Sequence, residues 1–118
     1  MQLPRTFYVN WFRKDESGSF LWPGFGENSR VLAWIFRRLE GEADAVDTPI
    51  GRVPAPGALD TDGLDISAED LDALLSVDPE DWKNELPSIR EHYAIFGDRL
   101  PQALRDQLSA LEQRLDNA

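Results

Sequence analysis

Two phenylalanines lie in a stretch of chain that cannot form a regular helix or strand, a third lies shortly before them, and an asparagine follows. The string FLWPGFGEN, residues 20–28, holds Phe20, Phe25 and Asn28 together with two glycines and a proline, which interrupt both helices and strands. Phe12 lies shortly before it. Rings on such a segment could stack on a flat ligand such as a nucleotide base, because every base has a π-face.

Polar groups beside these rings could supply the discrimination that stacking lacks. The side-chain amide of Asn28 offers one acceptor and two donors, which suit the edge of a base. The backbone amides of Gly26 and Glu27, just before an expected helix, could add donors. The alternative is a hydrophobic plug, in which the rings fold back onto the helix expected at 30–39. Composition alone favours the plug, and both interpretations stay open here.

Other residues with reactive side chains match no established site. His92 is the only histidine and cysteine is absent, so we expect a surface histidine rather than a metal ligand. The string at 60–65 begins like a calcium loop, but Asp65 and Leu71 occupy the positions that require glycine and glutamate, which favours an acidic turn. GFGENS, 24–29, lacks the lysine of a P-loop and the third glycine of a dinucleotide fingerprint. We therefore assign no catalytic residue and no metal ligand.

Length and charge limit the classes of partner. A chain of 118 residues suits one domain or one piece of a larger one. Residues 1–52 hold seven basic and seven acidic residues, whereas 53–118 hold five and fifteen. The acidic half argues against binding to nucleic acid or anionic membranes, which are polyanions. The longest apolar run, 31–36, is too short to cross a bilayer, and no signal peptide is visible, so we expect a soluble cytoplasmic protein.

The first third of the chain should position the rings. Residues 6–12, TFYVNWF, are β-branched and aromatic, which predicts a buried strand. A helix is expected from 30 to 39, with Asn28 or Ser29 as its cap and Gly41 just beyond its end. This helix is apolar nearly all round, so we expect it to be buried on several sides.

The rest of the chain is predicted to be a loop followed by an acidic helical tail. Residues 41–65 are loop-like, with at most a short edge strand near 50–53. Residues 66–118 should form three helices, and Pro87 should kink or split the second. Each helix has its own start signal: Ser67 with Asp70, Asp78 with Pro79, and Pro101.

The quoted segments also resemble a known family. YVNWFRKDESGSFLWPGFGENSRVLAWIFRRLEG, 8–41, is similar to the guanine-binding segment of GTP-dependent phosphoenolpyruvate carboxykinase. TPIGRVPAPGALDTDGLD, 48–65, and the helical tail resemble that enzyme's C-terminal end, so the likeness runs from Arg5 to Leu115. The resemblance implies an α+β fragment, with one or two strands and about four helices, from the C-terminal part of the enzyme's mixed α/β nucleotide-binding domain.

The resemblance also implies the roles of the residues near the rings. In the family, phenylalanines of this segment clamp the guanine, an asparagine reads the base edge, and the residues before it contact the nucleotide. The matching nucleotide-binding positions are Phe12, Phe20, Phe25, Gly26, Glu27 and Asn28.

The family's reaction implies partners that this chain does not contain. The enzyme converts oxaloacetate and GTP to phosphoenolpyruvate, CO2 and GDP in gluconeogenesis, using Mn2+ and a lysine-bearing kinase loop. In the family the kinase loop, the manganese ligands and the oxaloacetate-binding arginines lie upstream of the matched segment. We therefore expect guanine nucleotide and the remainder of the carboxykinase chain as partners, and no activity from these 118 residues alone.

We accordingly expect residues 1–118 to be one C-terminal guanine-nucleotide-binding portion. It would comprise 1–41 with the strand, aromatic loop and helix, the loop 42–65, and the tail 66–118. The alternative is a stand-alone, non-catalytic protein-interaction module derived from the same fold. Because the strand at 6–12 has no obvious partner, we expect the N-terminal third to be loosely ordered or to self-associate.

Overall fold

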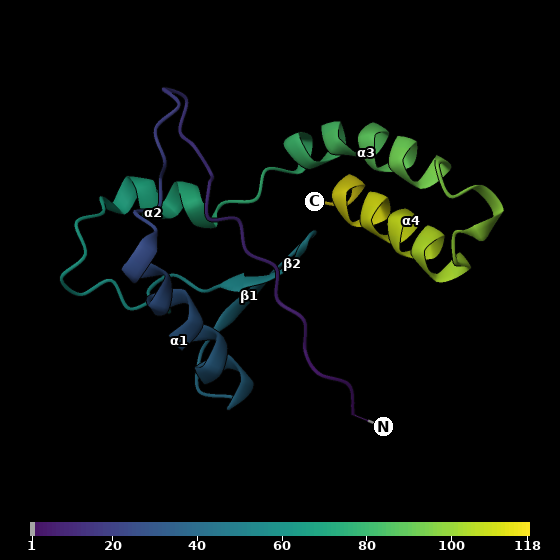
Figure 1. Cartoon of the computed structure of the whole chain (residues 1–118). Helices are drawn as coiled ribbons and strands as arrows, with labels where there is room; N and C mark the ends of the chain where they lie inside the picture. Colours follow the sequence, from purple (N-terminus) through teal and green to yellow (C-terminus); the bar gives the residue numbers. More distant parts are fainter. Residues whose placement is uncertain (1) are drawn as a thin grey trace. The chain divides into compact units, whose positions relative to one another are not determined.

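The computed structural model describes residues 2–118, and within them it contains four helices and one two-stranded sheet (Figure 1). The elements are α1 (Asn28–Leu39), β1 (Ala45–Thr48), β2 (Gly51–Pro54), α2 (Ala68–Leu75), α3 (Pro79–Ala94) and α4 (Gln102–Asp116). Short 3-10 turns at Phe25–Glu27 and Gly97–Arg99 precede α1 and α4. This content confirms the predicted α+β class. Within residues 2–118, no helix has both the length and the apolar character that a bilayer crossing requires.

The chain divides into two compact units. The first comprises the residues up to Val46 together with Arg52–Ser76, and the second comprises Asp47–Gly51 and Val77–Ala118. The rings and Asn28 all belong to the first unit.

The core of the first unit forms around Trp34 of α1. Trp34, Ala43 and Leu59 are buried together. The ring of Phe7 meets Trp34 edge-on, with the two ring centroids 6.2 Å apart. The Trp34 indole Nε1 donates a hydrogen bond to the carbonyl of Asp44 at 3.2 Å, which satisfies its buried polar group. One side chain therefore joins the helix to the loops on either side of it.

The prediction of a strand at 6–12 is wrong, because these residues form no regular element. Tyr8 is 92% exposed, and β1 and β2 are paired only with each other. The residue types suit a strand, but a strand is stable only when its backbone groups find a partner. Among residues 2–118 the segment has none, and its apolar contribution is reduced to Phe7 and the half-buried Trp11.

The sheet lies where the sequence indicated at most one short strand. A two-residue connection, Pro49 and Ile50, joins β1 to β2, so the pair is antiparallel. Thr48 Oγ1 donates to the carbonyl of Gly51 at 2.6 Å, and Gly51 adopts a φ of 127° that favours glycine. The sequence pattern therefore indicates β2 but not β1.

Helix α1 begins earlier than predicted and is less buried. Neither Asn28 nor Ser29 caps it, because the 3-10 turn at Phe25–Glu27 runs directly into its first turn. Gly41 follows its end with a φ of 78°, as expected. Only Trp34 is buried on this helix. The expected burial on several sides is wrong for the described residues, because one face is exposed: Leu32, Phe36 and Leu39.

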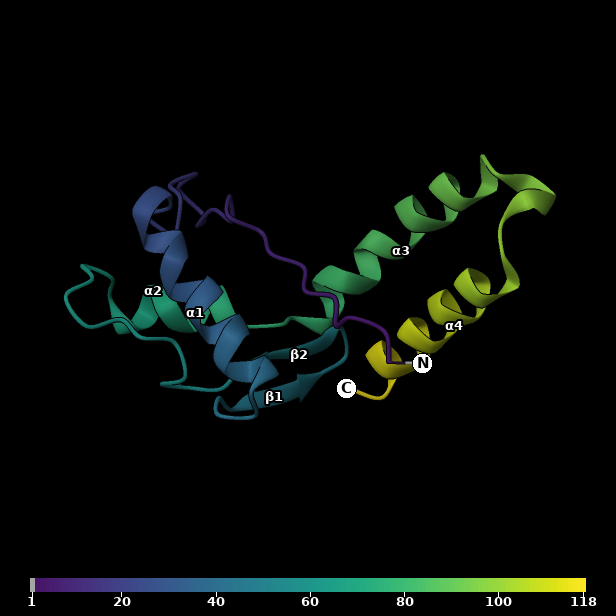
Figure 2. The same cartoon turned by 60° about the horizontal axis from the view of Figure 1, so that its bottom comes forward.

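In the second unit, α3 and α4 lie side by side and run in opposite directions (Figure 2). Leu86, Leu100 and Leu115 are buried there. Arg90 and Glu112 form an ion pair at 2.6 Å between the two helices. Exposed ion pairs contribute about 0–1 kcal/mol, so leucine packing dominates the stability of this helical pair.

The predicted helix starts in the tail are confirmed. Ser67 Oγ accepts from the Asp70 amide at 3.1 Å, and Asp78 Oδ1 accepts from the Glu80 amide at 3.0 Å. Such caps each contribute about 0.5–2 kcal/mol. Pro87 lies inside α3 without splitting it, and Pro101 stands at the start of α4.

Candidate nucleotide-base site

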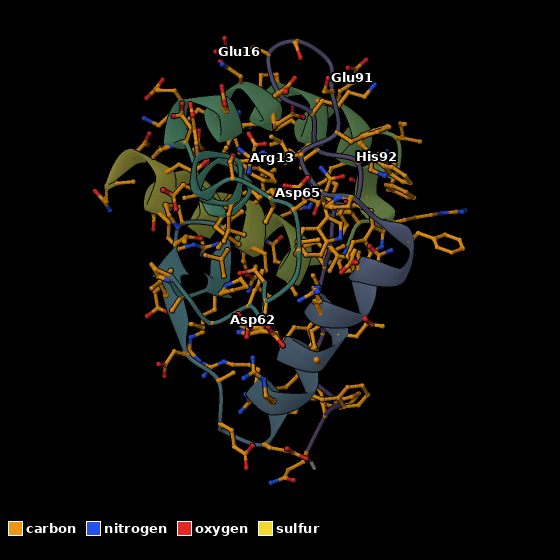
Figure 3. The ribbon with its side chains drawn as sticks, turned by 90° about the vertical axis from the view of Figure 1, so that its left-hand side faces the viewer. Arg13, Glu16, Asp62, Asp65, Glu91 and His92 are labelled. Atoms are coloured by element: carbon orange, nitrogen blue, oxygen red, sulfur yellow. The ribbon has the colours of Figure 1, made fainter. Side chains whose placement is uncertain are left out.

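A tight turn at residues 13–21 sets the positions of the first two rings. Its arms are held by a bridge between Lys14 and Phe20 and by a hydrogen bond from the Leu21 amide to the Arg13 carbonyl at 2.9 Å. Arg13 also donates from Nη1 to the carbonyl of Ser76 at 3.0 Å, at the end of α2. Figure 3 shows Arg13 at the base of this turn and Glu16 at its outer tip.

The carboxylate of Asp15 closes the turn. Its Oδ1 accepts from the Ser17 amide at 2.9 Å, from Ser17 Oγ at 2.6 Å and from the Ser19 amide at 3.0 Å. The Asp15 amide in turn donates to the Ser19 carbonyl at 2.9 Å. The polar string that separates the rings is therefore an ordered connection.

Acid is expected to open this turn. The hydrogen bonds from Ser17 and Ser19 hold the pKa of Asp15 below its ordinary value of 3.8. Because the folded-state pKa is depressed, the stabilising effect is fully present above pH 3.8 and is lost as the pH falls through the folded-state pKa. An NMR titration of the Ser17 and Ser19 amides should therefore give a midpoint below 3.8 that Asp15→Asn abolishes. A midpoint at or above that value would contradict the prediction.

Phe12 and Phe20 form one continuous aromatic wall. Their ring centroids lie 6.0 Å apart with planes inclined at 57°, which is direct contact with no space for a base between them. Both rings face solvent, at 71% and 59% exposure. The ammonium of Lys14 lies 5.1 Å from the centre of the Phe20 ring, an arrangement suited to a cation–π contact.

The residues after Phe20 point the other way. Leu21 and Trp22 are both buried. The hydrophobic plug and the stacking surface therefore involve different residues. Leu21 and Trp22 are buried, as the plug predicts, whereas the phenylalanines are exposed, as a stacking surface requires.

Phe25 is displayed by an unusual backbone conformation. Its φ is 54°, the only positive φ of a non-glycine residue in the part of the chain that the structure describes. Gly24 before it has a φ of 74°. The Phe25 side chain is 98% exposed, so packing against residues 2–118 does not hold it there. A bulky residue in this region carries strain, and such strain concentrates at functional sites.

Asn28, the first residue of α1, is oriented by a neighbour. Its Oδ1 accepts a hydrogen bond from Trp22 Nε1 at 2.9 Å. The Asn28 side chain is half-buried, and its amide nitrogen makes no hydrogen bond to residues 2–118. The amide group therefore retains two donors for a ligand.

Glu27 has a partner of its own. Its carboxylate accepts from Arg30 Nε, and this bond raises the pKa of Arg30. Arg30 Nη1 also donates to the carbonyl of Asp60 at 2.9 Å. Arg30 thus joins Glu27 in the turn to the loop at 58–65. Gly26 has open space on the side where a Cβ would lie.

Residues 2–118 do not enclose the rings, since Phe12, Phe20 and Phe25 are 71%, 59% and 98% exposed. A depression of about 230 Å³ in the same unit is lined by residues 37, 42–44 and 56–58 instead. A ligand stacked on these exposed rings would need a further surface to enclose it.

The remaining candidates behave as structural residues. His92, labelled in Figure 3, is exposed. Its ring meets the ring of Phe96 edge-on, with the two centroids 5.4 Å apart. Asp60 Oδ1 accepts from the Asp62 amide at 3.0 Å, which makes the acidic string a turn. No group of three or more metal-binding side chains occurs within residues 2–118.

Comparison with known proteins covers the whole of this site. The family model described as the phosphoenolpyruvate carboxykinase C-terminal P-loop domain matches residues 1–114. A relative from Treponema pallidum (strain Nichols), named phosphoenolpyruvate carboxykinase [GTP], is 57% identical over 117 residues, which is 98% of this chain and 19% of the relative.

Two further relatives carry the same name. The one from Arthrobacter sp. (strain FB24) is 54% identical over 114 residues, and the one from Neocallimastix frontalis is 54% identical over 118 residues; they cover 97% and 99% of this chain. The chain spans 19% of the length of each relative. The aromatic turn, the exposed rings and the match along the chain agree, and the chain belongs to the family of GTP-dependent phosphoenolpyruvate carboxykinases.

Proposed function

We propose that this chain supplies the guanine-binding part of a GTP-dependent phosphoenolpyruvate carboxykinase. Two observations carry the proposal: three phenylalanine rings are exposed, and the side-chain amide of Asn28 retains free donors. Phe12 and Phe20 would provide one wall of a base slot and Phe25 the other. Gly26 and Glu27 would contribute backbone contacts between them.

The reaction of the complete enzyme would be the conversion of oxaloacetate and GTP to phosphoenolpyruvate, CO2 and GDP. This chain would supply no catalytic residue. The manganese that the family uses finds no fitting ligand set within residues 2–118, so its ligands and the phosphate-binding loop would come from the remaining four fifths of the enzyme.

That remainder would also be the main partner of the first unit. Leu32, Phe36 and Leu39 form an exposed apolar face on α1. Apolar residues grouped on one face mark an interaction surface, whereas single scattered ones do not. The unpaired segment at 6–12 adds a second surface suited to pairing in a larger sheet. No observation on residues 2–118 favours the alternative of an independent interaction module.

The isolated chain should bind guanine nucleotides weakly. Stacking on two walls contributes roughly 2–6 kcal/mol, whereas association costs on the order of 4–15 kcal/mol in lost freedom. We therefore expect affinities in the millimolar range, about 4 kcal/mol in free energy, or weaker.

Truncation of Asn28 tests the proposal. We expect GTP to shift the NMR signals of Phe12, Phe20 and Phe25 at lower concentration than ATP does. Asn28→Ala should lower that preference by about tenfold, because it removes the donors aimed at the base edge. Asn84→Ala, which removes an exposed amide from α3, serves as the matched control. Equal responses to GTP and ATP in the wild-type chain would refute the proposal.

A further inference from the structure

A single hydrogen bond decides which atoms of Asn28 a ligand can meet. The indole nitrogen of Trp22 can only donate, so the bond at 2.9 Å requires the amide oxygen of Asn28 to face it. The amide NH2 group must then face away from Trp22. Because no buried side-chain nitrogen or oxygen lacks a partner within residues 2–118, this NH2 group has access to solvent or to a ligand.

Both ends of this bond are anchored. Trp22 is buried next to Leu21 in the interior of the first unit. Asn28 is the first residue of α1, so its backbone is fixed by the helix. The remaining freedom of the Asn28 amide is rotation about its two side-chain bonds, and the hydrogen bond from Trp22 restricts both and fixes which amide atom faces the indole.

We propose that Trp22 is a positioning residue that sets the base preference of the slot; this inference rests on the guanine-binding function proposed above. With its oxygen held, Asn28 presents donors to the ligand. Guanine and hypoxanthine carry an acceptor oxygen at C6, whereas adenine carries a donor amino group there. Donors therefore select 6-oxopurines, and a site built to pair such groups rejects a base that cannot pair.

The test compares GMP, IMP and AMP, which share one phosphate group, in NMR titrations of the complete 118-residue chain. We expect the wild-type chain to prefer GMP and IMP over AMP by about tenfold. Trp22→Phe keeps a buried ring but removes the donor, so the amide can turn its oxygen toward adenine. Its preference should fall to about threefold or less.

Trp34→Phe is the matched control. Trp34 is also buried in the first unit, and its indole donates to the Asp44 carbonyl rather than to Asn28. This variant should keep the wild-type preference. An equal loss in both variants would overturn the inference, because the effect would then follow from general loosening of the unit.

A second variant decides the matter if Trp22→Phe fails to fold. Asn28→Leu keeps a side chain of similar size but removes the NH2 group that the Trp22 contact directs at the base. We expect its preference for GMP and IMP over AMP to fall to about threefold or less, and an unchanged preference would overturn the inference. If folded Trp22→Phe keeps the wild-type preference, the role of Trp22 falls while guanine binding stands. Equal binding of GMP and AMP by the wild-type chain would overturn both.

Discussion

Trp34→Ala is expected to unfold the first unit under conditions in which the wild-type chain is folded. Trp34 is 4% exposed, and it contacts Phe7, Ala43 and Leu59 around its ring. Truncating a buried tryptophan costs about 3–5 kcal/mol, because the lost transfer energy adds to the cost of the cavity. The variant also leaves the Asp44 carbonyl without its indole donor. For a unit of this size, the combined loss of packing and of this hydrogen bond is a large part of the free energy of unfolding.

Phe36→Ala on the same helix is the control, because Phe36 is exposed. It should change the free energy of unfolding by about 0.5 kcal/mol or less. Urea unfolding followed by near-ultraviolet circular dichroism would measure both variants. Similar losses in the two would contradict the placement of the core around Trp34.

The chain by itself should form no phosphoenolpyruvate from oxaloacetate and GTP in the presence of Mn2+. Phosphoryl transfer depends on a lysine-bearing phosphate loop and metal ions. The sequence has two lysines, and neither lies in a glycine-rich loop. Lys14 lies over the Phe20 ring, and Lys83 pairs with Glu80 at 3.1 Å. Measurable turnover by the homogeneous protein would contradict this prediction.

Supplying the missing part should restore the reaction. The Treponema pallidum relative, shortened by its matching segment, would be mixed or co-expressed with this chain, and phosphoenolpyruvate formation would be followed. We expect turnover only when both parts are present. Phe36→Ala should reduce the restored rate if the exposed face of α1 is buried against the added part. No turnover from a folded mixture would count against that interface.

Local signals in the sequence predicted local structure well. The caps at Ser67 and Asp78 formed as expected, because a cap depends on residues two or three positions away. The strand at 6–12 failed for the opposite reason. Its residues favour a strand, but pairing depends on a partner elsewhere, and no strand among residues 2–118 takes that role.

The sequence indicated which residues form the candidate site, but not which of their side chains face solvent and which face the interior. Loop residues have no periodicity, so nothing in the string FLW indicates that Phe20 faces out while Leu21 and Trp22 face in. The Trp22–Asn28 hydrogen bond was also missed. Its signal was present, since a tryptophan that turns inward needs an acceptor nearby. The engagement of Glu27 by Arg30 is a further contact that the match to a family cannot reveal.

The left-handed backbone at Phe25 affects which amino acids evolution would favour at this position. A φ of 54° suits glycine and works against a bulky side chain, and the ring gains nothing from its own chain in return. Selection for stability alone would replace this residue. If Phe25 stacks on a base as proposed, binding would offset this strain, so the ring would be kept for the ligand and not for the fold.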